Sequence, residues 1–269
     1  MTEQGILYVA TGESYRAEAA YSALSARAVM PGLPITLISD SPGDSAAFDE
    51  TLLLADPRFD FQDKIRGIGM SPFHRTIFLD SDTYIAADIS DLFILLDRFD
   101  LAAAHSVGRE NVPIPGIPYA FSELNTGVLA FKKSAEWESL VSKWLARYLA
   151  DRDRMDHREG RELAGDQVAF RELVYYSDLR LAILPPEYNC RYDAGFLFGE
   201  ARVIHQRSDG PEIAKSAAML NSVSGKRVHL ADHPDAIIRR WTVIDHGIGE
   251  NSVLLRALLR EEEGNHISR

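Results

Sequence analysis

The stretch KIRGIGMSPFHRTIFLDSDTYIAADISDLF, residues 64–93, predicts both the centre of the fold and the centre of the site. Its apolar run at 76–79 is β-branched and aromatic, which is typical of a buried strand. Asp80 and Asp82 follow this run directly, and on an extended chain two such side chains point the same way. Because buried carboxylates repel each other, we expect a cation between them, and oxygen ligands favour Mg²⁺ or Mn²⁺.

The composition is that of an ordinary globular protein. The chain has 269 residues, of which 46% are hydrophobic and 26% charged, enough for one large domain or two small ones. No run of about 18 apolar residues occurs, so no transmembrane segment is expected, and residues 1–10 lack the pattern of a signal peptide. The single cysteine, Cys190, excludes an internal disulfide and favours a cytoplasmic location. A net charge of −11 argues against a nucleic-acid partner.

The N-terminal part reads as a β-α-β unit, with strands at 5–10 and 35–39 and a helix at 16–30. Such units pair their strands in parallel through a right-handed crossover, so we expect an α/β sheet with helices on both faces. Ligands bind such sheets beyond the carboxyl ends of the strands, so the turn at Thr11 and the Asp80–Asp82 pair should share one cleft. The GxGxxG fingerprint of NAD or FAD binding is absent.

Further elements are expected along the rest of the chain. Ser134 should cap a helix whose core face includes Trp137 and Trp144. The charged segment 151–162 is expected to be solvated, and 105–122 to be an irregular loop. The remaining predicted elements are a short helix ending at 96, strands at 99–104, 124–131, 181–184 and 201–204, and helices at 168–175 and 253–260.

Five segments, in order, carry a resemblance to a known family. They are LYVAT at 7–11; Lys64 with Asp80-Ser81-Asp82 and the following ISDLF; Asn125-Thr126-Gly127-Val128; Gly165-Asp166-Gln167; and ARVIH, which ends at His205. A bare DxD triplet is unspecific, but the ordered set is similar to the retaining GT-A glycosyltransferases of the glycogenin and bacterial galactosyltransferase type, the glycosyltransferase 8 family. The resemblance covers residues 5–207.

The resemblance implies the GT-A fold, a Rossmann-like, mixed but mainly parallel sheet with helices on both faces. It implies a catalytic domain over 1–230, with 231–269 as a C-terminal extension packed on or near it. It also implies a metal-dependent hexosyltransferase that moves a sugar, with retention, from a nucleotide-diphosphate donor. UDP-hexose is the expected donor. A glycan, a lipid-linked sugar, a protein or a small molecule is the expected acceptor.

The same resemblance assigns roles to individual residues. Mn²⁺ or Mg²⁺ would be held by Asp80, Asp82 and His205, with Asp80 also contacting the ribose. The nucleotide would lie against Ala10, Thr11, Tyr15, Lys64 and Ser81, and the donor sugar against Asn125, Asp166 and Gln167. Family members commonly follow the histidine with a Lys-Pro-Trp-like segment that grips the diphosphate. Here QRSDGP follows His205, so Arg207 or Lys215 is a candidate replacement for that lysine.

Three alternatives remain from the residues alone. Phosphohydrolases of the haloacid dehalogenase type also place DxD after an apolar strand, but they want Thr or Val where Tyr84 stands. A nucleotidyltransferase would want a glycine-rich, basic loop after the first strand, and GESYRA does not supply one. A non-catalytic nucleotide-sugar-binding relative is compatible with the altered segment after His205.

Overall fold

The computed structural model describes residues 2–106, 112–154, 165–191, 195–205, 210–222, 226–230 and 240–244. Across these residues the main sheet has seven strands in the order β3-β2-β1-β4-β7-β6-β8. The strands are β1 (Thr2–Val9), β2 (Ile35–Ser39), β3 (Glu50–Leu53), β4 (Phe73–Leu79), β6 (Leu101–His105), β7 (Leu124–Lys132) and β8 (Leu181–Leu184). Neighbours pair in parallel, except that β7 runs antiparallel to both β4 and β6. The predicted mixed, mainly parallel sheet is confirmed.

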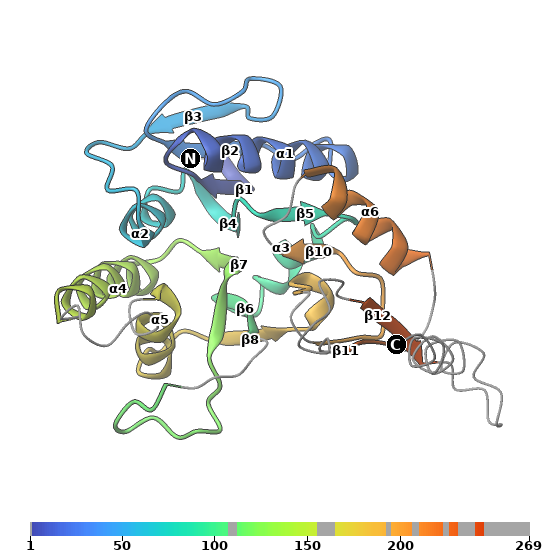
Figure 1. Ribbon diagram of the computed structural model, residues 1–269. Coiled ribbons are helices and arrows are strands. Elements are labelled where there is room, and N and C mark those ends of the chain that lie inside the picture. The colour runs from blue at the N-terminus through green and yellow to red at the C-terminus, as the bar shows by residue number, and fades with distance from the viewer. Residues whose placement is uncertain are drawn as a thin grey trace, which may run out of the picture.

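Helices cover both faces of this sheet (Figure 1). On one face lie α1 (Glu13–Val29) and α3 (Asp91–Leu95), and on the other α2 (Phe61–Gly69), α4 (Ala135–Arg154) and α5 (Asp166–Tyr175). Within β1, Ile6 and Tyr8 pack under α1, whereas Leu7 packs with residues of α2, α4 and α5. A sheet buried on both faces needs nearly continuous apolar strands, which explains runs such as ILYV.

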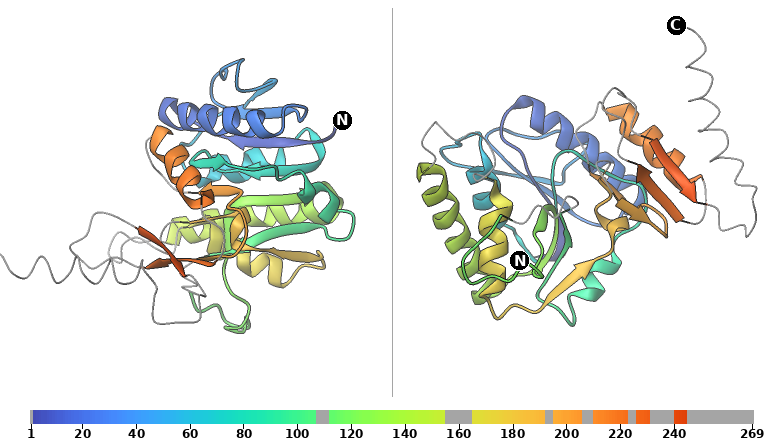
Figure 2. Two further views of the ribbon diagram at one scale, coloured as in Figure 1. Left: turned by 90° about the vertical axis from the view of Figure 1, so that its right-hand side faces the viewer. Right: turned by 60° about the horizontal axis from the view of Figure 1, so that its bottom comes forward.

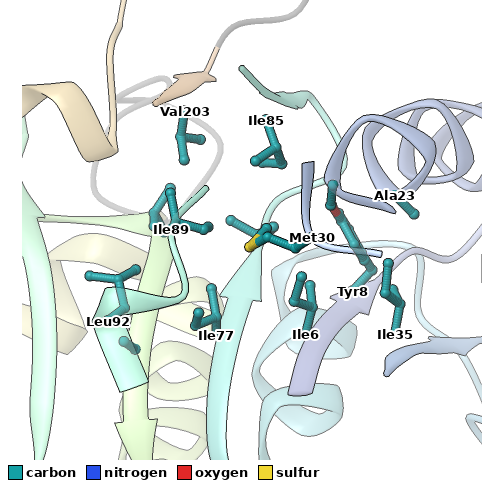
Figure 3. Packing of buried hydrophobic residues seen from close by; sticks show 14 of the residues in the cluster. Ile6, Tyr8, Ala23, Met30, Ile35, Ile77, Ile85, Ile89, Leu92 and Val203 are labelled. Carbon is teal, nitrogen blue, oxygen red and sulfur yellow. The ribbon is translucent and has the colours of Figure 1, made fainter. Parts of the chain in front are cut away.

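The core under α1 extends beyond the main sheet. Figure 3 shows Ile6 and Ile77 of the sheet facing the same interior as Ala23 of α1, Ile85 of β5 and Val203 of β10. Strands β5 (Thr83–Ile85) and β10 (Val203–His205) form a separate antiparallel pair. Apolar packing therefore ties the segment directly after the DxD triplet to the segment that ends in His205.

A second small sheet lies at the other end of the molecule from α4 and α5 (Figure 2). It consists of β9 (Gly195–Leu197), β11 (Lys226–Leu230) and β12 (Arg240–Ile244), all antiparallel. Helix α6 (Gly210–Asn221) and the 3-10 turn η1 (Pro186–Tyr188) complete the elements. Of the extension at 231–269, the structure describes β12, which pairs with β11. The division at residue 230 stays a prediction.

Several expectations about single elements are confirmed. Ser134 caps α4, since its Oγ accepts from the backbone N–H of Trp137 at 3.2 Å, and Trp137 and Trp144 are buried. The strands predicted at 99–104, 124–131, 181–184 and 201–204 form as β6, β7, β8 and β10. The helix expected at 253–260 lies outside the described residues, as does most of the segment expected to be solvated at 151–162. In the described part of the chain, no helix combines the length and apolarity needed to cross a membrane.

The sequence pattern missed strands β3, β5, β9, β11 and β12 and helices α2 and α6. In α2, Asp60 caps the helix by accepting from the N–H of Gln62 at 2.7 Å, and Ile65 and Ile68 form its buried face. Two glycines obscure that pattern, yet Gly67 is required because a Cβ there would lie 2.6 Å from the Val9 methyl groups. The α6 sequence begins Gly-Pro, which marks a helix start as readily as a loop.

Candidate functional site

A cavity of about 530 Å³ opens at the carboxyl ends of β1 and β4. Its volume is typical of small-molecule sites. The lining includes every residue to which the resemblance assigned a role in metal, nucleotide or sugar binding: Ala10, Thr11, Tyr15, Lys64, Asp80, Ser81, Asp82, Asn125, Asp166, Gln167 and His205. A second cavity of about 420 Å³ between α2 and α4 is lined mainly by apolar side chains and includes none of them. The fold thus brings the predicted residues into one cavity.

The two aspartates lie in the turn between β4 and β5, not on an extended strand as expected. Their convergence has a different origin. Strand β5 pairs with β10 so that Thr83 stands opposite His205. This register brings His205 Nε2 to 3.4 Å from Asp82 Oδ1 and to 3.7 Å from Asp80 Oδ2. A two-stranded ribbon beside the main sheet therefore completes the group.

The three side chains fit a divalent cation. Each offers one ligand atom, and these atoms all lie within 4.8 Å of one another. Burial raises the pKa of the Asp80 carboxyl, the charge of Lys64 and that of a protonated His205 oppose this shift, and the charges of Asp82 and Asp166 add to it. The carboxylates are thus poorly compensated by the protein alone. Two carboxylates and an imidazole are ligands that Mn²⁺ accepts, and Mg²⁺ prefers the oxygens.

Gly127 on β7 makes room for the imidazole. A Cβ at this position would lie 2.0 Å from His205 Cε1 and 2.6 Å from Nδ1. The Cε1 atom of the ring therefore lies close to the β7 backbone at Gly127, and any side chain at residue 127 would displace the ring. The Asn-Thr-Gly-Val segment is thus coupled directly to the histidine.

Lys64 lies at the centre of a buried ion network and not on the surface. Its Nζ lies 2.9 Å from Asp80 Oδ1 and 3.1 Å from Asp166 Oδ2, and it donates to Thr126 Oγ1 at 3.2 Å. Burial lowers the pKa of Lys64, but the carboxylates of Asp166 and Asp80 outweigh this, and the net shift is upward. Lys64 therefore stays charged and holds the first aspartate of the triplet beside the start of α5.

Asp166 does not serve as the cap of α5, because its side chain turns toward the network. Its carboxylate is 5% exposed and accepts from Thr126 Oγ1 at 2.7 Å, while its backbone carbonyl accepts from Trp144 Nε1 at 2.8 Å. The neighbouring Gln167 accepts from Asn125 Nδ2 at 2.8 Å. These hydrogen bonds thus fix the first turn of α5 at the cavity wall.

The opposite wall is shaped by Asp63, a fully buried carboxylate. It accepts from Thr11 Oγ1 at 3.0 Å and from the backbone N–H of Phe59 at 2.7 Å. Phe59 has a φ of 59°, a left-handed conformation that costs energy for a bulky residue. The rings of Phe59 and Tyr15 are exposed and flank Gly12, whose φ is 91°. They form an aromatic rim on this side of the cavity.

Ala10 and Ser81, the remaining predicted residues, make hydrogen bonds that fix the turns after β1 and β4. Ala10 is buried, and its carbonyl accepts from Ser39 Oγ at 2.6 Å. Ser81 Oγ donates to Glu18 Oε2 at 3.1 Å. These contacts anchor the turn after β1 and the DxD turn to α1 and β2, so the cavity floor is built from the strand ends themselves.

Sequence reasoning missed several residues of the site. Asp63 had a usable signal, since Asp60 and Asp63 open α2 three residues apart. Thr126 stands inside a motif that was identified. No sequence signal indicated Arg191, which lines the cavity, or Glu123 and Asn189, which hydrogen-bond to Gln167 and His205. The bridge between Cys190 and Ile204 places Asn189 and Arg191. Of the candidates for the diphosphate-gripping lysine, Arg207 lies outside the described residues, and Lys215 is exposed on α6 and is not among the lining residues.

Comparison with solved structures identifies the fold. The glycosyltransferase GlyE of Streptococcus pneumoniae TIGR4 superposes with a TM-score of 0.52 and 18% identity, over 71% of this chain and 48% of that one. The chain thus spans about half the length of the GlyE structure. No protein-family model and no curated protein matches the sequence.

Two further structures show weaker similarity. The galactosyltransferase LgtC, in complex with donor and acceptor sugar analogues, has a TM-score of 0.48 and 12% identity, over 70% of this chain and 75% of that one. Mouse xyloside xylosyltransferase 1 has a TM-score of 0.45 and 14% identity, over 71% and 88%. With the observed sheet order and the GlyE match, the chain has a GT-A glycosyltransferase fold like that of the glycosyltransferase 8 family.

Proposed function

We propose that the protein is a metal-dependent hexosyltransferase that moves a sugar from a nucleotide-diphosphate donor, UDP-hexose in the first instance, with retention at the anomeric carbon. One observation carries this proposal. Two carboxylates and an imidazole from distant parts of the chain converge in a cavity at the carboxyl edge of a GT-A sheet. Such an edge is where α/β sheets bind their ligands.

Asp80, Asp82 and His205 would hold Mn²⁺ or Mg²⁺. A divalent cation bound there would act as a Lewis acid that stabilises the departing diphosphate. Lys64 forms an ion pair with Asp80 and so fixes the position of this carboxylate beside the other two metal-site residues. The side chains of the first turn, Thr11 and Tyr15, would seat the ribose and the base, with Ala10 and Ser81 as the floor. The exposed ring of Tyr15 supports this role, because an aromatic face stacks well on a planar base.

Asn125, Asp166 and Gln167 would contact the donor sugar. The supporting observation is that α5 begins at the cavity and presents Asp166 and Gln167 from its first turn. A carboxylate held there by Lys64 and Thr126 stabilises positive charge that develops at the anomeric carbon. Asn125 fixes the amide of Gln167, so the two act as one rigid unit.

Arg191 is our candidate for the missing diphosphate grip. It lines the cavity, as do the three metal-site residues. Its neighbour Cys190 is bridged to Ile204, and that places Arg191 close to the strand that carries His205. A guanidinium can bind a diphosphate through two parallel hydrogen bonds. Arg191 would thus replace the lysine that family members carry after the histidine.

The acceptor remains one of the classes named above. Residues 105–122 and the C-terminal region are the proposed acceptor surfaces, because loops around a fixed core vary most. We also propose a cytoplasmic location, supported by a single, buried cysteine that leaves the chain without an internal disulfide. The comparisons give no support to the phosphohydrolase or to a non-catalytic relative.

A panel of nucleotide sugars tests the proposal. With Mn²⁺ present, one donor should raise the melting temperature and slowly release its nucleoside diphosphate, and EDTA should abolish both effects. D82N should behave like the EDTA sample, whereas the exposed Asp97 gives a matched control, D97N, that should match the wild type. Steady release of phosphate from simple phosphate esters, without any response to nucleotide sugars, would contradict the proposal.

A further inference from the structure

We propose that Asn189 is a positioning residue that holds His205 as its Nδ1–H tautomer and so leaves Nε2 to bind the cation. This inference rests on the proposed function, since it concerns the same metal site. Asn189 is the last link in a chain of hydrogen-bonded side chains that runs from Glu123 through the half-buried Gln167 and through Asn125 to the histidine.

Two groups determine which atom donates and which accepts in each of these hydrogen bonds, because one can only donate and the other, a carboxylate, only accepts. The backbone N–H of Gly127 can only donate, so the Asn125 atom 2.9 Å from it is the amide oxygen. At the other end, the carboxylate of Glu123 accepts from Gln167 Nε2 at 3.0 Å. Both ends demand that Asn125 donate to Gln167 Oε1, which it does at 2.8 Å. The amide orientations therefore follow from the network and are not arbitrary.

The same logic fixes the imidazole. Because Asn125 presents its oxygen, Asn189 must donate to it through Nδ2, at 2.8 Å. Asn189 Oδ1 then faces His205 Nδ1 at 2.8 Å. A carbonyl oxygen only accepts, so Nδ1 carries the proton, and a neutral imidazole has no second one. Nε2 is left with its lone pair directed toward Asp82 and Asp80.

Burial stabilises the hydrogen bond between Asn189 and His205. Asn189 and His205 are each 3% exposed, so water does not readily replace a lost partner. The backbone at Gly127 lies against the ring. A ring flip would place a carbon opposite Asn189 Oδ1 and leave that oxygen without its donor. Hydrogen-bonded partners of this kind tune metal-ligating histidines by about 10- to 100-fold in affinity.

The first test reads the tautomer without any metal. Long-range ¹H–¹⁵N correlation spectra of EDTA-treated, ¹⁵N-histidine-labelled protein should show a protonated Nδ1 for His205, because Asn189 Oδ1 accepts from it. The signals of His205 are identified by their loss in H205Q. An unprotonated Nδ1 in the wild type would overturn the proposal, because Asn189 Oδ1 would then face a second acceptor.

The second test compares Asn189→Ala with a matched Asn→Ala control. Asn221 makes two hydrogen bonds to Ala201, just before β10, but has no part in the chain of amides. N189A should lose the uniform Nδ1–H tautomer and bind Mn²⁺ at least about 10-fold more weakly by calorimetry. N221A should lower the melting temperature only. Mn²⁺ affinity that is unchanged in folded N189A would overturn the proposal.

The two tests separate this inference from the proposed function. A wild-type protein with the Nδ1–H tautomer that binds no Mn²⁺ would support the role of Asn189 while contradicting a metal-dependent transferase. If N189A fails to fold, the wild-type spectrum alone still decides which nitrogen carries the proton.

Discussion

His205 stands directly opposite Thr83 in the β5–β10 pair, and this register places its Nε2 3.4 Å from Asp82 Oδ1. Thr83 anchors this two-stranded ribbon through two contacts. Its Oγ1 lies 2.7 Å from Ser22 Oγ of α1 and donates to the backbone carbonyl of Asp80 at 2.8 Å. One residue therefore links α1, the DxD turn and the strand of the histidine. The metal group is a property of this anchored ribbon more than of the main sheet.

Removing one aspartate of the pair should stabilise the metal-free protein while abolishing cation binding. Asp82 adds to the upward shift in the pKa of Asp80, a shift caused first by burial, and this marks repulsion between the two. We expect D82N to raise the free energy of unfolding in EDTA by about 1 kcal/mol and to lose stabilisation by Mn²⁺. Urea denaturation with and without Mn²⁺ measures both. The prediction is wrong if Mn²⁺ stabilises D82N as much as the wild type.

A methyl group at Gly127 should disturb the histidine. The added Cβ would lie 2.0 Å from His205 Cε1, and such overpacking typically costs about 1–3 kcal/mol. We expect G127A to lose stability in this range and to bind Mn²⁺ more weakly, because the ring must move. Gly32 provides the control, since nothing lies within 4 Å of a Cβ built there. Equal Mn²⁺ affinity in G127A and G32A would refute the proposed contact.

Neutralising Lys64 should be strongly destabilising. Its side chain is 11% exposed and pairs with Asp80 and Asp166. K64M keeps most of the apolar stem but leaves two buried carboxylates without their cation, which costs about 3–5 kcal/mol when such a pair is broken. The exposed Lys143 on α4 provides K143M, expected to change stability by less than about 0.5 kcal/mol. Similar denaturation midpoints for the two variants would show that Lys64 is not part of a critical ion pair.

Arg191 should act on donor binding if it holds the diphosphate. Loss of a hydrogen bond to a charged group costs about 1.5–3 kcal/mol, so R191A should raise KM for the nucleotide sugar by about tenfold or more. R191K should recover part of this loss, because a single ammonium cannot bind two oxygens in parallel. Steady-state kinetics at saturating Mn²⁺ give the comparison. A KM unchanged in R191A would assign the grip to another residue.

Acid should weaken the protein through Asp100. Hydrogen bonds from Arg180 hold the pKa of Asp100 far below its usual range, and Lys132 adds to this effect. Because the pKa is lowered by folding, the stabilisation is present above about pH 4, the value of the unfolded carboxyl, and is lost as the pH falls further. We expect D100N to be less stable than the wild type by about 1 kcal/mol at pH 7. That gap should close as the pH drops toward 2; a constant gap would contradict the assignment.

Local patterns predicted the strands of the main sheet except β3, whereas most site residues were assigned by the resemblance to a glycosyltransferase family. Buried strands such as the one at 76–79 can be predicted from continuous apolar runs, because both of their faces pack against helices. Asp80 and Asp82 were identifiable because paired carboxylates directly after an apolar strand are unusual, whereas Asp166 was assigned only by the resemblance, since a carboxylate at a helix start is usually a cap. The edge strand β3 and helix α2 were missed, since a half-exposed strand and a glycine-rich helix carry weak periodicity.

Local sequence patterns could not predict which of the site residues contact one another. The pairing of β5 with β10, the bridge from Cys190 to Ile204 and the close approach of Gly127 to His205 all join segments far apart in the chain. Their partners are chosen by packing of the whole core, which no local pattern encodes. The sequence by itself therefore determined which chemical groups the protein has and which strand ends carry them. Only the tertiary structure decided that Asn189 faces the histidine and that Lys64 is shared by two carboxylates, because hydrogen bonds and ion pairs depend on distances that folding alone creates.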